Sequence, residues 1–227
     1  ELLARCCEDA GVAIEDLEGI GVSCPGPFRR VKGMVELVAP NMCGALAPDR
    51  AVVPNDWPAI PLEEDLRAAL PGTRLAVDND AVAGAAAEGK LGAGRGLSDF
   101  VYVTWSTGIG AGAFVDGHLV TGKNDNAVHL GHTLMRLDDE RSLEEGWQEA
   151  DNLESFVSGP AIARQYGVGQ DTLEVFQRCR EGDPKATRII EQAARAFARA
   201  LVNATTLFDT KLIIVGGSVA NDWDILE

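Results

Sequence analysis

The segment VDNDA at residues 77–81 is followed along the chain by TWSTGIGAG at residues 104–112. The first segment ends an apolar run with the carboxylate of Asp80, and the second is a hydroxyl- and glycine-rich turn between two apolar strands. Phosphoryl transfer requires a carboxylate that can accept a proton and a loop whose backbone can surround phosphates. These residues therefore make a small-molecule kinase the leading hypothesis.

The segments around these motifs alternate between helical and strand patterns. We expect helices at residues 2–10, 61–70, 81–88, 154–157 and 186–208, and strands at residues 17–24, 75–77, 100–103, 113–115 and 212–215. Residues 33–38 are expected to form a hairpin arm, and residues 40–61 form a proline-rich surface loop. Strands that alternate with helices predict an α/β fold.

Length and charge limit the classes of protein that fit. At 227 residues the chain can form one large domain or two small ones. Its net charge of −15 argues against a nucleic-acid partner, because a phosphate backbone would be repelled. No apolar stretch is long enough to cross a bilayer, and the first residues lack the order of a secretory signal. We therefore expect a cytoplasmic protein with no membrane partner.

The cysteines and histidines give no sign of a metal site. The chain has five cysteines, with no Cys-x-x-Cys spacing, and three histidines, none of which lies close in sequence to a cysteine. An odd number of cysteines does not indicate a disulfide framework. We expect reduced, mostly buried thiols and no metal bound by protein ligands.

Each motif also has a purely structural explanation. Asp80 follows a strand and precedes a helix, where an aspartate is a common N-cap. The glycines at residues 107–112 also suit a tight hairpin, and without a following lysine they form neither a Walker loop nor a dinucleotide fingerprint. A tight strand-to-helix turn explains residues 216–218 as well as a nucleotide contact does. His132 alone fits a structural histidine, and a carboxylate at Glu154 favours the dipole of the expected helix.

Taken in order, the motifs resemble the ROK family of sugar kinases and sugar-responsive repressors, within the actin-like ATPase superfamily. The matching segments are GVSCPGP at 21–27, PN at 40–41, DNDA at 78–81 with Glu88, STGIGAG at 106–112, GH at 131–132, LE at 153–154 with SG at 158–159, and VGG at 215–217. The resemblance covers nearly the whole chain. It implies a two-domain actin-like (ribonuclease H-like) ATPase fold, with residues 1–84 as the remainder of the small α/β domain and residues 85–227 as a larger α/β domain.

The resemblance also implies a role for each matched residue. Asp80 would be the catalytic base that deprotonates a sugar hydroxyl, most often at C6. The side chains that would hydrogen-bond sugar hydroxyls are Asn41, Asn79, His132 and Glu154. The turn that contains Gly26 would shape the sugar pocket.

For the nucleotide, the resemblance implies that Thr107 and Gly108 contact ATP phosphates and that Gly216 and Gly217 lie near the adenosine. Mg²⁺ would bridge the nucleotide phosphates. The protein would act mainly by positioning and electrostatics, because phosphoryl transfer requires little covalent chemistry from it. The resemblance also implies a homodimer or a higher homo-oligomer.

The chain departs from the family pattern at three places. The usual Gly-Glu-x-Gly-His is VHLGH at residues 128–132, so His129 replaces a sugar-binding glutamate. The cysteine-rich zinc motif expected between His132 and Glu154 is absent, and an acidic segment with Trp147 stands in its place, so we predict no structural zinc. Trp105 is bulky at a position that is usually aliphatic. We expect these changes to affect sugar specificity more than the fold.

The ends of the chain also differ from the family pattern. The first phosphate loop, an Asp-x-Gly-x-Thr hairpin, should precede residues 2–10 and is missing. The chain stops soon after Gly217, before the usual closing helices. We therefore expect a fragment of a longer protein that is truncated at both ends and lacks part of its nucleotide site.

These expectations favour an ATP-dependent, glucokinase-like hexose kinase that phosphorylates glucose at C6. The nearest alternative is a kinase for fructose, N-acetylmannosamine or another amino sugar, because the imidazole of His129 and a carboxylate do not recognise hydroxyls identically. A different class is a non-catalytic ROK-type sugar-sensing regulator, which would need a DNA-binding helix-turn-helix that this sequence does not show. The presence of Asp80 favours catalysis, because a sensor does not need a base.

Overall fold

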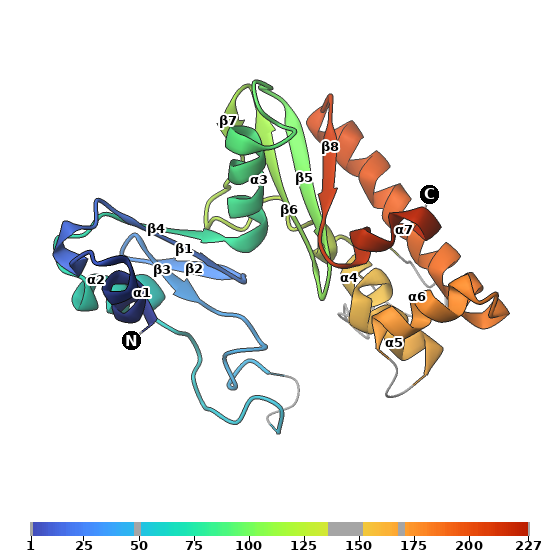
Figure 1. Cartoon of the computed structure of the whole chain (residues 1–227), viewed down its shortest axis with the longest axis horizontal. Helices are drawn as coiled ribbons and strands as arrows, with labels where there is room; N and C mark the ends of the chain where they lie inside the picture. The colour runs from blue at the N-terminus through green and yellow to red at the C-terminus, as the bar shows by residue number, and fades with distance from the viewer. Residues whose placement is uncertain (1, 48–50, 136–151, 168–170, 227) are drawn as a thin grey trace, which may run out of the picture. The chain divides into compact units, whose positions relative to one another are not determined.

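The structure is a computed structural model that describes residues 2–47, 51–135, 152–167 and 171–226. The chain forms two compact units, which we name unit 1 (residues 1–80 and 122–126) and unit 2 (residues 81–121 and 127–227) (Figure 1). The chain therefore passes between the units three times, at residues 80–81, 121–122 and 126–127. The domain boundary expected after residue 84 lies inside a helix and stays a prediction.

Unit 1 combines two pairs of strands with two α-helices. Its elements are α1 (Leu2–Ala10), the 3-10 helix η1 (Ile14–Asp16), β1 (Ile20–Cys24), β2 (Phe28–Val31), β3 (Met34–Leu37), α2 (Leu62–Ala69) and β4 (Leu75–Asn79). Strands β1 and β4 pair in parallel, and β2 and β3 form an antiparallel hairpin. Because Cys24 pairs with Asn79, β1 and β4 end at the same edge.

The hairpin and helix α2 share the core of unit 1. Phe28, Val35, Leu37, Ala39 and Val77 are buried there, and apolar residues of α2 pack against them. This burial follows from the alternation along β3, in which every second side chain points into the core.

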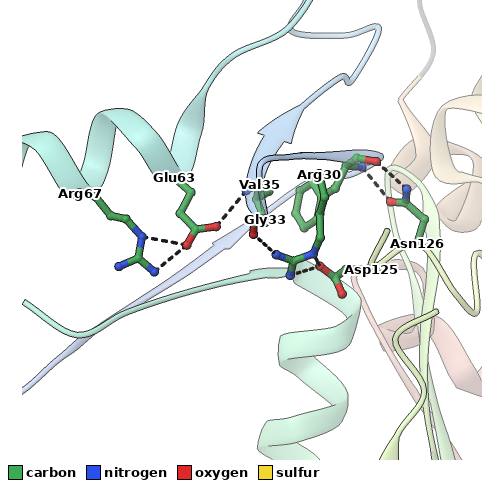
Figure 2. Close-up of polar contacts among 8 residues, drawn as sticks. Arg30, Gly33, Val35, Glu63, Arg67, Asp125 and Asn126 are labelled. Carbon is green, nitrogen blue, oxygen red and sulfur yellow. Dashed lines mark hydrogen bonds and ion pairs between the residues drawn. The ribbon is translucent and has the colours of Figure 1, made fainter. Parts of the chain in front are cut away.

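A buried carboxylate joins α2 to the hairpin. Glu63 accepts hydrogen bonds from the Val35 backbone N–H at 2.9 Å and from two Arg67 guanidinium nitrogens at 3.0 and 2.7 Å (Figure 2). Burial acts to raise the pKa of Glu63, but the Val35 N–H and Arg67 outweigh it and lower that pKa. Glu63 is therefore a charged residue that stabilises the packing of α2 on β3.

Unit 2 is built around a four-stranded sheet with the order β7-β6-β5-β8. Its elements are α3 (Asp80–Leu91, whose first residue belongs to unit 1), β5 (Phe100–Trp105), β6 (Ile109–Val115), β7 (His118–Leu119), η2 (Leu130–His132), α4 (Leu153–Val157), α5 (Gly159–Tyr166), α6 (Thr172–Arg180), α7 (Pro184–Phe208), β8 (Ile213–Gly216), η5 (Val219–Asp222) and α8 (Trp223–Leu226). Strand β8 pairs with β5 in parallel, and the other neighbouring strands are antiparallel.

Helices cover both faces of this sheet, with α3 on one side and α7 on the other (Figure 1). On the α7 side, the Trp105 ring stacks on Phe197 with the ring centroids 4.0 Å apart. On the α3 side, a Cβ at Gly110 or Gly112 would lie 2.7 Å from the Cβ of Ala81 or Ala85, respectively. The glycines of β6 and the alanines of α3 therefore allow the helix and the strand to pack closely.

Helix α7 shows how the sequence defines the longest element. The Asp183 side chain accepts hydrogen bonds from two backbone N–H groups at its start, and Pro184 occupies its first turn. Buried side chains such as Ile189, Ile190 and Phe197 recur on one face. The helix ends where Asp209 adopts a left-handed φ of 46°.

The mixed α/β fold is confirmed, and the expected helix at residues 2–10 matches α1. The expected strand at residues 17–24 begins three residues too early, because β1 spans Ile20–Cys24. The sequence patterns did not predict β2, β7, α5, α6 or α8. None of the helices among the described residues is long and apolar enough to cross a membrane.

Candidate functional site

In unit 1, two expected site segments meet where β1 and β4 end. Strand β1 leads into the turn at residues 25–27, where the Gly26–Pro27 peptide bond is cis, and β4 ends at Asn79, directly before Asp80. Because Cys24 and Asn79 are register partners, Gly26 and Asp80 both follow the carboxyl ends of paired parallel strands. Ligands of α/β proteins bind at this kind of edge.

The two residues of the expected catalytic motif differ in exposure. Asn79 is buried, with 8% of its surface exposed, whereas Asp80 is exposed as the first residue of α3. Burial and the charges of Asp80 and Asp78 raise the pKa of the neighbouring Cys24 thiol to about 11. Cys24 is therefore neutral near pH 7, and Asp80 supplies an accessible carboxylate at this edge.

Asn41 lies on a loop that is attached beside the same turn. The Val38 N–H donates a hydrogen bond to the Pro27 carbonyl at 3.0 Å, three residues before the exposed Asn41. The Asn55 side chain holds the loop, because it accepts from the Gly44 N–H at 2.8 Å and donates to the Met42 carbonyl at 3.0 Å. The sequence analysis missed this role of Asn55, which no local pattern marks.

In unit 2, the β5–β6 turn presents backbone donors. No hydrogen bond within the described part of the chain uses the N–H of Thr107 or Gly108, and the Thr107 side chain is exposed. Adjacent backbone N–H groups in turns are the donors from which proteins build anion-binding concavities. Residues 106–108 form the tight turn of the antiparallel β5–β6 hairpin, as the structural explanation expected. Gly108, Gly110 and Gly112 do not have positive φ values, so backbone conformation does not explain them, whereas close packing against α3 explains Gly110 and Gly112.

The end of β8 lies beside this turn. Strand pairing aligns Thr104 with Gly216, and the hydroxyls of Ser106 and Ser218 are 2.8 Å apart. The structure therefore brings together the two segments expected to bind ATP, residues 107–108 and 216–217. The sequence analysis did not single out Ser106 and Ser218, although hydroxyl residues that flank both motifs are a visible signal.

Glu154 and the turn that contains His132 also lie in unit 2. Glu154 Oε2 accepts a hydrogen bond from the Ile109 N–H at 2.8 Å, directly beside the glycine-rich turn. The Leu153 N–H donates to the Thr133 carbonyl at 3.0 Å, which joins α4 to the end of η2. The His129 and His132 rings have centroids 5.6 Å apart, with His132 exposed and His129 half-buried. These contacts place Glu154 against the turn expected to bind phosphates.

The comparison with known families decides the family of this chain. The sequence pattern of the ROK family matches residues 13–227. The chain belongs to the ROK family. The match includes every residue that the sequence analysis assigned to the sugar, the nucleotide or catalysis.

Two curated relatives of this ROK protein are sugar kinases. A glucokinase of Pyrobaculum calidifontis is 33% identical over 221 residues, which cover 95% of this chain and 68% of that enzyme. An N-acetylmannosamine kinase of Haemophilus influenzae is 37% identical over 144 residues, which cover 62% of this chain and 47% of that enzyme. The ROK chain therefore matches about two thirds of one relative and about half of the other.

Solved ROK structures share the fold. The ROK hexokinase of Thermus thermophilus superposes with a TM-score of 0.72 at 32% identity, covering 98% of this chain and 70% of that one. A ROK glucokinase of Streptomyces griseus, solved with glucose and AMPPNP, superposes with a TM-score of 0.66 at 26% identity. The match covers 97% of this chain and 72% of that one. A ROK transcriptional regulator superposes with a TM-score of 0.74 at 22% identity, covering 99% of this chain and 55% of that one. At this identity the similarity shows the fold alone.

Of the departures from the family pattern, the structure explains Trp105 but does not test the missing zinc motif. Trp105 belongs to the core, because it is 1% exposed and its indole N–H donates to the Val157 carbonyl at 2.7 Å. Among the residues described, no group of three or more His, Cys, Asp or Glu side chains could hold a metal ion. The acidic segment with Trp147 lies outside the described residues, so the absence of structural zinc stays a prediction.

Proposed function

We propose that this ROK protein is an ATP-dependent sugar kinase that transfers the γ-phosphate of ATP to a hexose hydroxyl. The observation that carries the proposal is the exposed carboxylate of Asp80, which follows β4 at the edge where β1 also ends. The curated relatives named glucokinase and N-acetylmannosamine kinase support it. A two-domain actin-like ATPase fold, with unit 1 in the small domain and unit 2 in the larger one, is part of the proposal.

In this proposal, Asp80 accepts the proton of the sugar hydroxyl as its oxygen attacks the γ-phosphorus and ADP leaves. A base must lie within hydrogen-bond reach of the proton that it takes. The exposed carboxylate of Asp80 is accessible to a sugar hydroxyl. Asn79 and Asn41 orient the sugar, and the turn at Gly26 shapes the pocket beside them. In unit 2, His132 and the second oxygen of Glu154 are assigned to the sugar as well.

The nucleotide is assigned to unit 2. The open N–H groups of Thr107 and Gly108 suit phosphate oxygens, and Gly216 and Gly217 suit the adenosine, because β8 places them beside that turn. Mg²⁺ carried by the nucleotide would neutralise the developing charge on the phosphates. The role of these chain segments is to hold ATP in place.

Glucose is the first candidate substrate, with phosphorylation at C6, because the longest curated match described above is to a glucokinase. N-acetylmannosamine is the second, because the relative with that activity has the higher identity over a shorter stretch. Fructose stays a third. A non-catalytic sugar-sensing regulator is the alternative from another class, and the fold does not separate it from a kinase, because a regulator shares the fold. The presence of Asp80 favours the kinase, because a sensor needs no base.

The test is sugar-dependent release of ADP by the full-length protein with Mg-ATP. The panel is glucose, fructose, mannose, N-acetylmannosamine and N-acetylglucosamine, with Asp80→Ala as the control. We expect turnover on glucose that is lost in Asp80→Ala. Sugar binding without turnover on any member of the panel would support the regulator instead. Light scattering on the same preparation tests the proposed homodimer or higher homo-oligomer.

A further inference from the structure

Residues 122–126 form a short segment that is attached to the hairpin of unit 1. Both of its chain neighbours, Thr121 and Ala127, belong to unit 2. The Asn126 side chain accepts a hydrogen bond from the Phe28 N–H at 2.7 Å and donates one to the Phe28 carbonyl at 2.6 Å (Figure 2). One side-chain amide therefore satisfies both backbone groups of Phe28, as a neighbouring strand would.

An ion pair lies next to this contact. Arg30 donates from Nε to the Asp125 carboxylate at 2.6 Å and from Nη1 to the Gly33 carbonyl at 2.7 Å (Figure 2). Burial raises the pKa of Asp78, Asp125 raises it further, and Arg30 opposes them. The segment therefore lies close enough to β4 to influence the carboxylate directly before Asn79.

On the hairpin side, the Asn126 contact holds the backbone next to an expected sugar-binding turn. Phe28 is 2% exposed in the core of unit 1 and directly follows the turn at residues 25–27. The Pro27 carbonyl also accepts from the Val38 N–H, which begins the loop that carries Asn41. Asn126 therefore pairs with the residue that joins the turn to the hairpin.

On the other side, Asn126 is close in the chain to the loop expected to bind the sugar from unit 2. Only Ala127 and Val128 separate it from His129, so the two Cα atoms lie at most about 11 Å apart for any arrangement of the units. Val128 has a φ of 61°, an uncommon conformation for a β-branched residue. The chain between Asn126, which we name the clamp because its side chain binds both backbone groups of Phe28, and the loop at residues 129–132 is therefore both short and conformationally restricted.

We propose that Asn126 is a positioning residue that joins the turn at residues 25–27 to the loop at residues 129–132. This inference rests on the proposed function, because it assigns both segments to the sugar. Loss of the Asn126 amide releases the hairpin from the chain that leads to His129. The Arg30–Asp125 ion pair contributes less, because exposed ion pairs are weak.

Two measurements on the full-length protein test the proposal. Hydrogen exchange compares the wild type with Asn126→Ala, and exchange should become faster in the peptides that contain residues 25–31 and 127–133. Steady-state kinetics then compares the KM values for sugar and for ATP. We expect Asn126→Ala to raise the KM for the sugar about tenfold, while the KM for ATP and kcat change less than about threefold.

Two further variants sharpen the comparison. Asn126→Asp keeps an acceptor for the Phe28 N–H but places a carboxylate against the Phe28 carbonyl, so it should behave like Asn126→Ala. Asn124→Ala is the matched control, because Asn124 is exposed in the same segment and no hydrogen bond of its side chain occurs among the described residues. If circular dichroism shows that Asn126→Ala is unfolded, Asn126→Ser carries the same comparison.

The outcomes separate this proposal from the proposed function. Exchange does not depend on sugar, so unchanged exchange in both peptides of a folded Asn126 variant overturns the clamp whatever the protein phosphorylates. A wild type without sugar turnover contradicts the proposed function and removes the basis for a sugar-positioning role, even if the exchange result is as expected. A wild type with turnover, combined with an unchanged sugar KM in Asn126→Ala, overturns the positioning role alone.

Discussion

Glu154 Oε2 accepts a hydrogen bond from the backbone N–H of Ile109 at 2.8 Å. A negative side chain is therefore held against the turn whose neighbouring N–H groups, at Thr107 and Gly108, are proposed to bind phosphate. The carboxylate satisfies the third N–H of this turn and fixes its position. Its second oxygen, Oε1, makes no hydrogen bond among the described residues and is proposed for the sugar.

The first prediction concerns this bond. Glu154→Ala should lower the free energy of unfolding by about 1–3 kcal/mol, because it leaves the backbone N–H of the buried Ile109 without its acceptor. Glu154→Gln should cost less, because the amide oxygen can still accept from Ile109. Urea denaturation of both variants measures the difference. Equal stability of Glu154→Ala and the wild type would mean that the bond is not formed.

A second prediction uses the neighbouring glycine. A Cβ at Gly108 would lie 2.6 Å from Glu154 Oε2, which forces the carboxylate to move. Gly108→Ala should therefore destabilise the wild type more than it destabilises Glu154→Ala. A double-mutant cycle should give a coupling energy of about 0.5–3 kcal/mol. Additive effects of the two substitutions would place the Glu154 side chain elsewhere.

A third prediction concerns Val128, which has a φ of 61°. A left-handed conformation costs an L-residue about 1–2 kcal/mol, and glycine avoids that cost. Val128→Gly should therefore be more stable than Val128→Ala by about 1 kcal/mol, which corresponds to about 2–4 °C in Tm. Because both variants remove the valine side chain, the difference between them measures backbone strain with little change in side-chain packing. Thermal unfolding checks the order, and a lower Tm for the glycine variant would contradict the conformation.

A fourth prediction follows from Cys24, whose pKa rises from 9.0 to about 11 through burial and the charges of Asp80 and Asp78. Well below pH 9.0 the thiol is protonated in both the folded and the unfolded chain, so it adds no pH dependence. Between pH 9.0 and about 11 the unfolded chain releases a proton that the folded chain retains, so stability falls as the pH rises.

Cys24→Ser should lose less stability across this window than the wild type. Some loss should remain, because burial also raises the pKa of Cys43. Denaturation curves at the two ends of the window measure the difference. Parallel pH profiles of the variant and the wild type would mean that the pKa of Cys24 is not raised in the folded protein.

The local sequence predicted the elements that carry their own signals. Helix α7 has an N-capping aspartate, an early proline and a long apolar stripe, and its predicted start at residue 186 is two residues late. Strand β2 was missed because its FRRV sequence contains two exposed arginines and buries only Phe28. Helices α5 and α6 were missed although Ser158 and Asp171 cap their first turns. Those capping residues were readable in the sequence.

The site was predictable only where its residues belong to a local motif. Asn79 and Asp80 form such a motif, in which Asn79 ends β4 and Asp80 begins α3. The Asn126 contact with Phe28 joins residues 98 apart, and the Glu154 contact with Ile109 joins residues 45 apart. Each depends on tertiary packing that no local pattern encodes. The same holds for Gly110 and Gly112. Only the packing of α3 against β6 explains why these positions have no side chain.

The most direct test of the account measures turnover and sugar affinity together in a matched pair of variants. Asp80→Asn and Asp78→Asn each remove one carboxylate from neighbouring positions, and only Asp80 is proposed as the base. The account predicts that Asp80→Asn lowers kcat of the full-length protein by about 10²-fold or more, with the calorimetric Kd for the sugar changed less than about threefold. Asp78→Asn should keep kcat within about tenfold of the wild type. Wild-type turnover in Asp80→Asn would contradict the account.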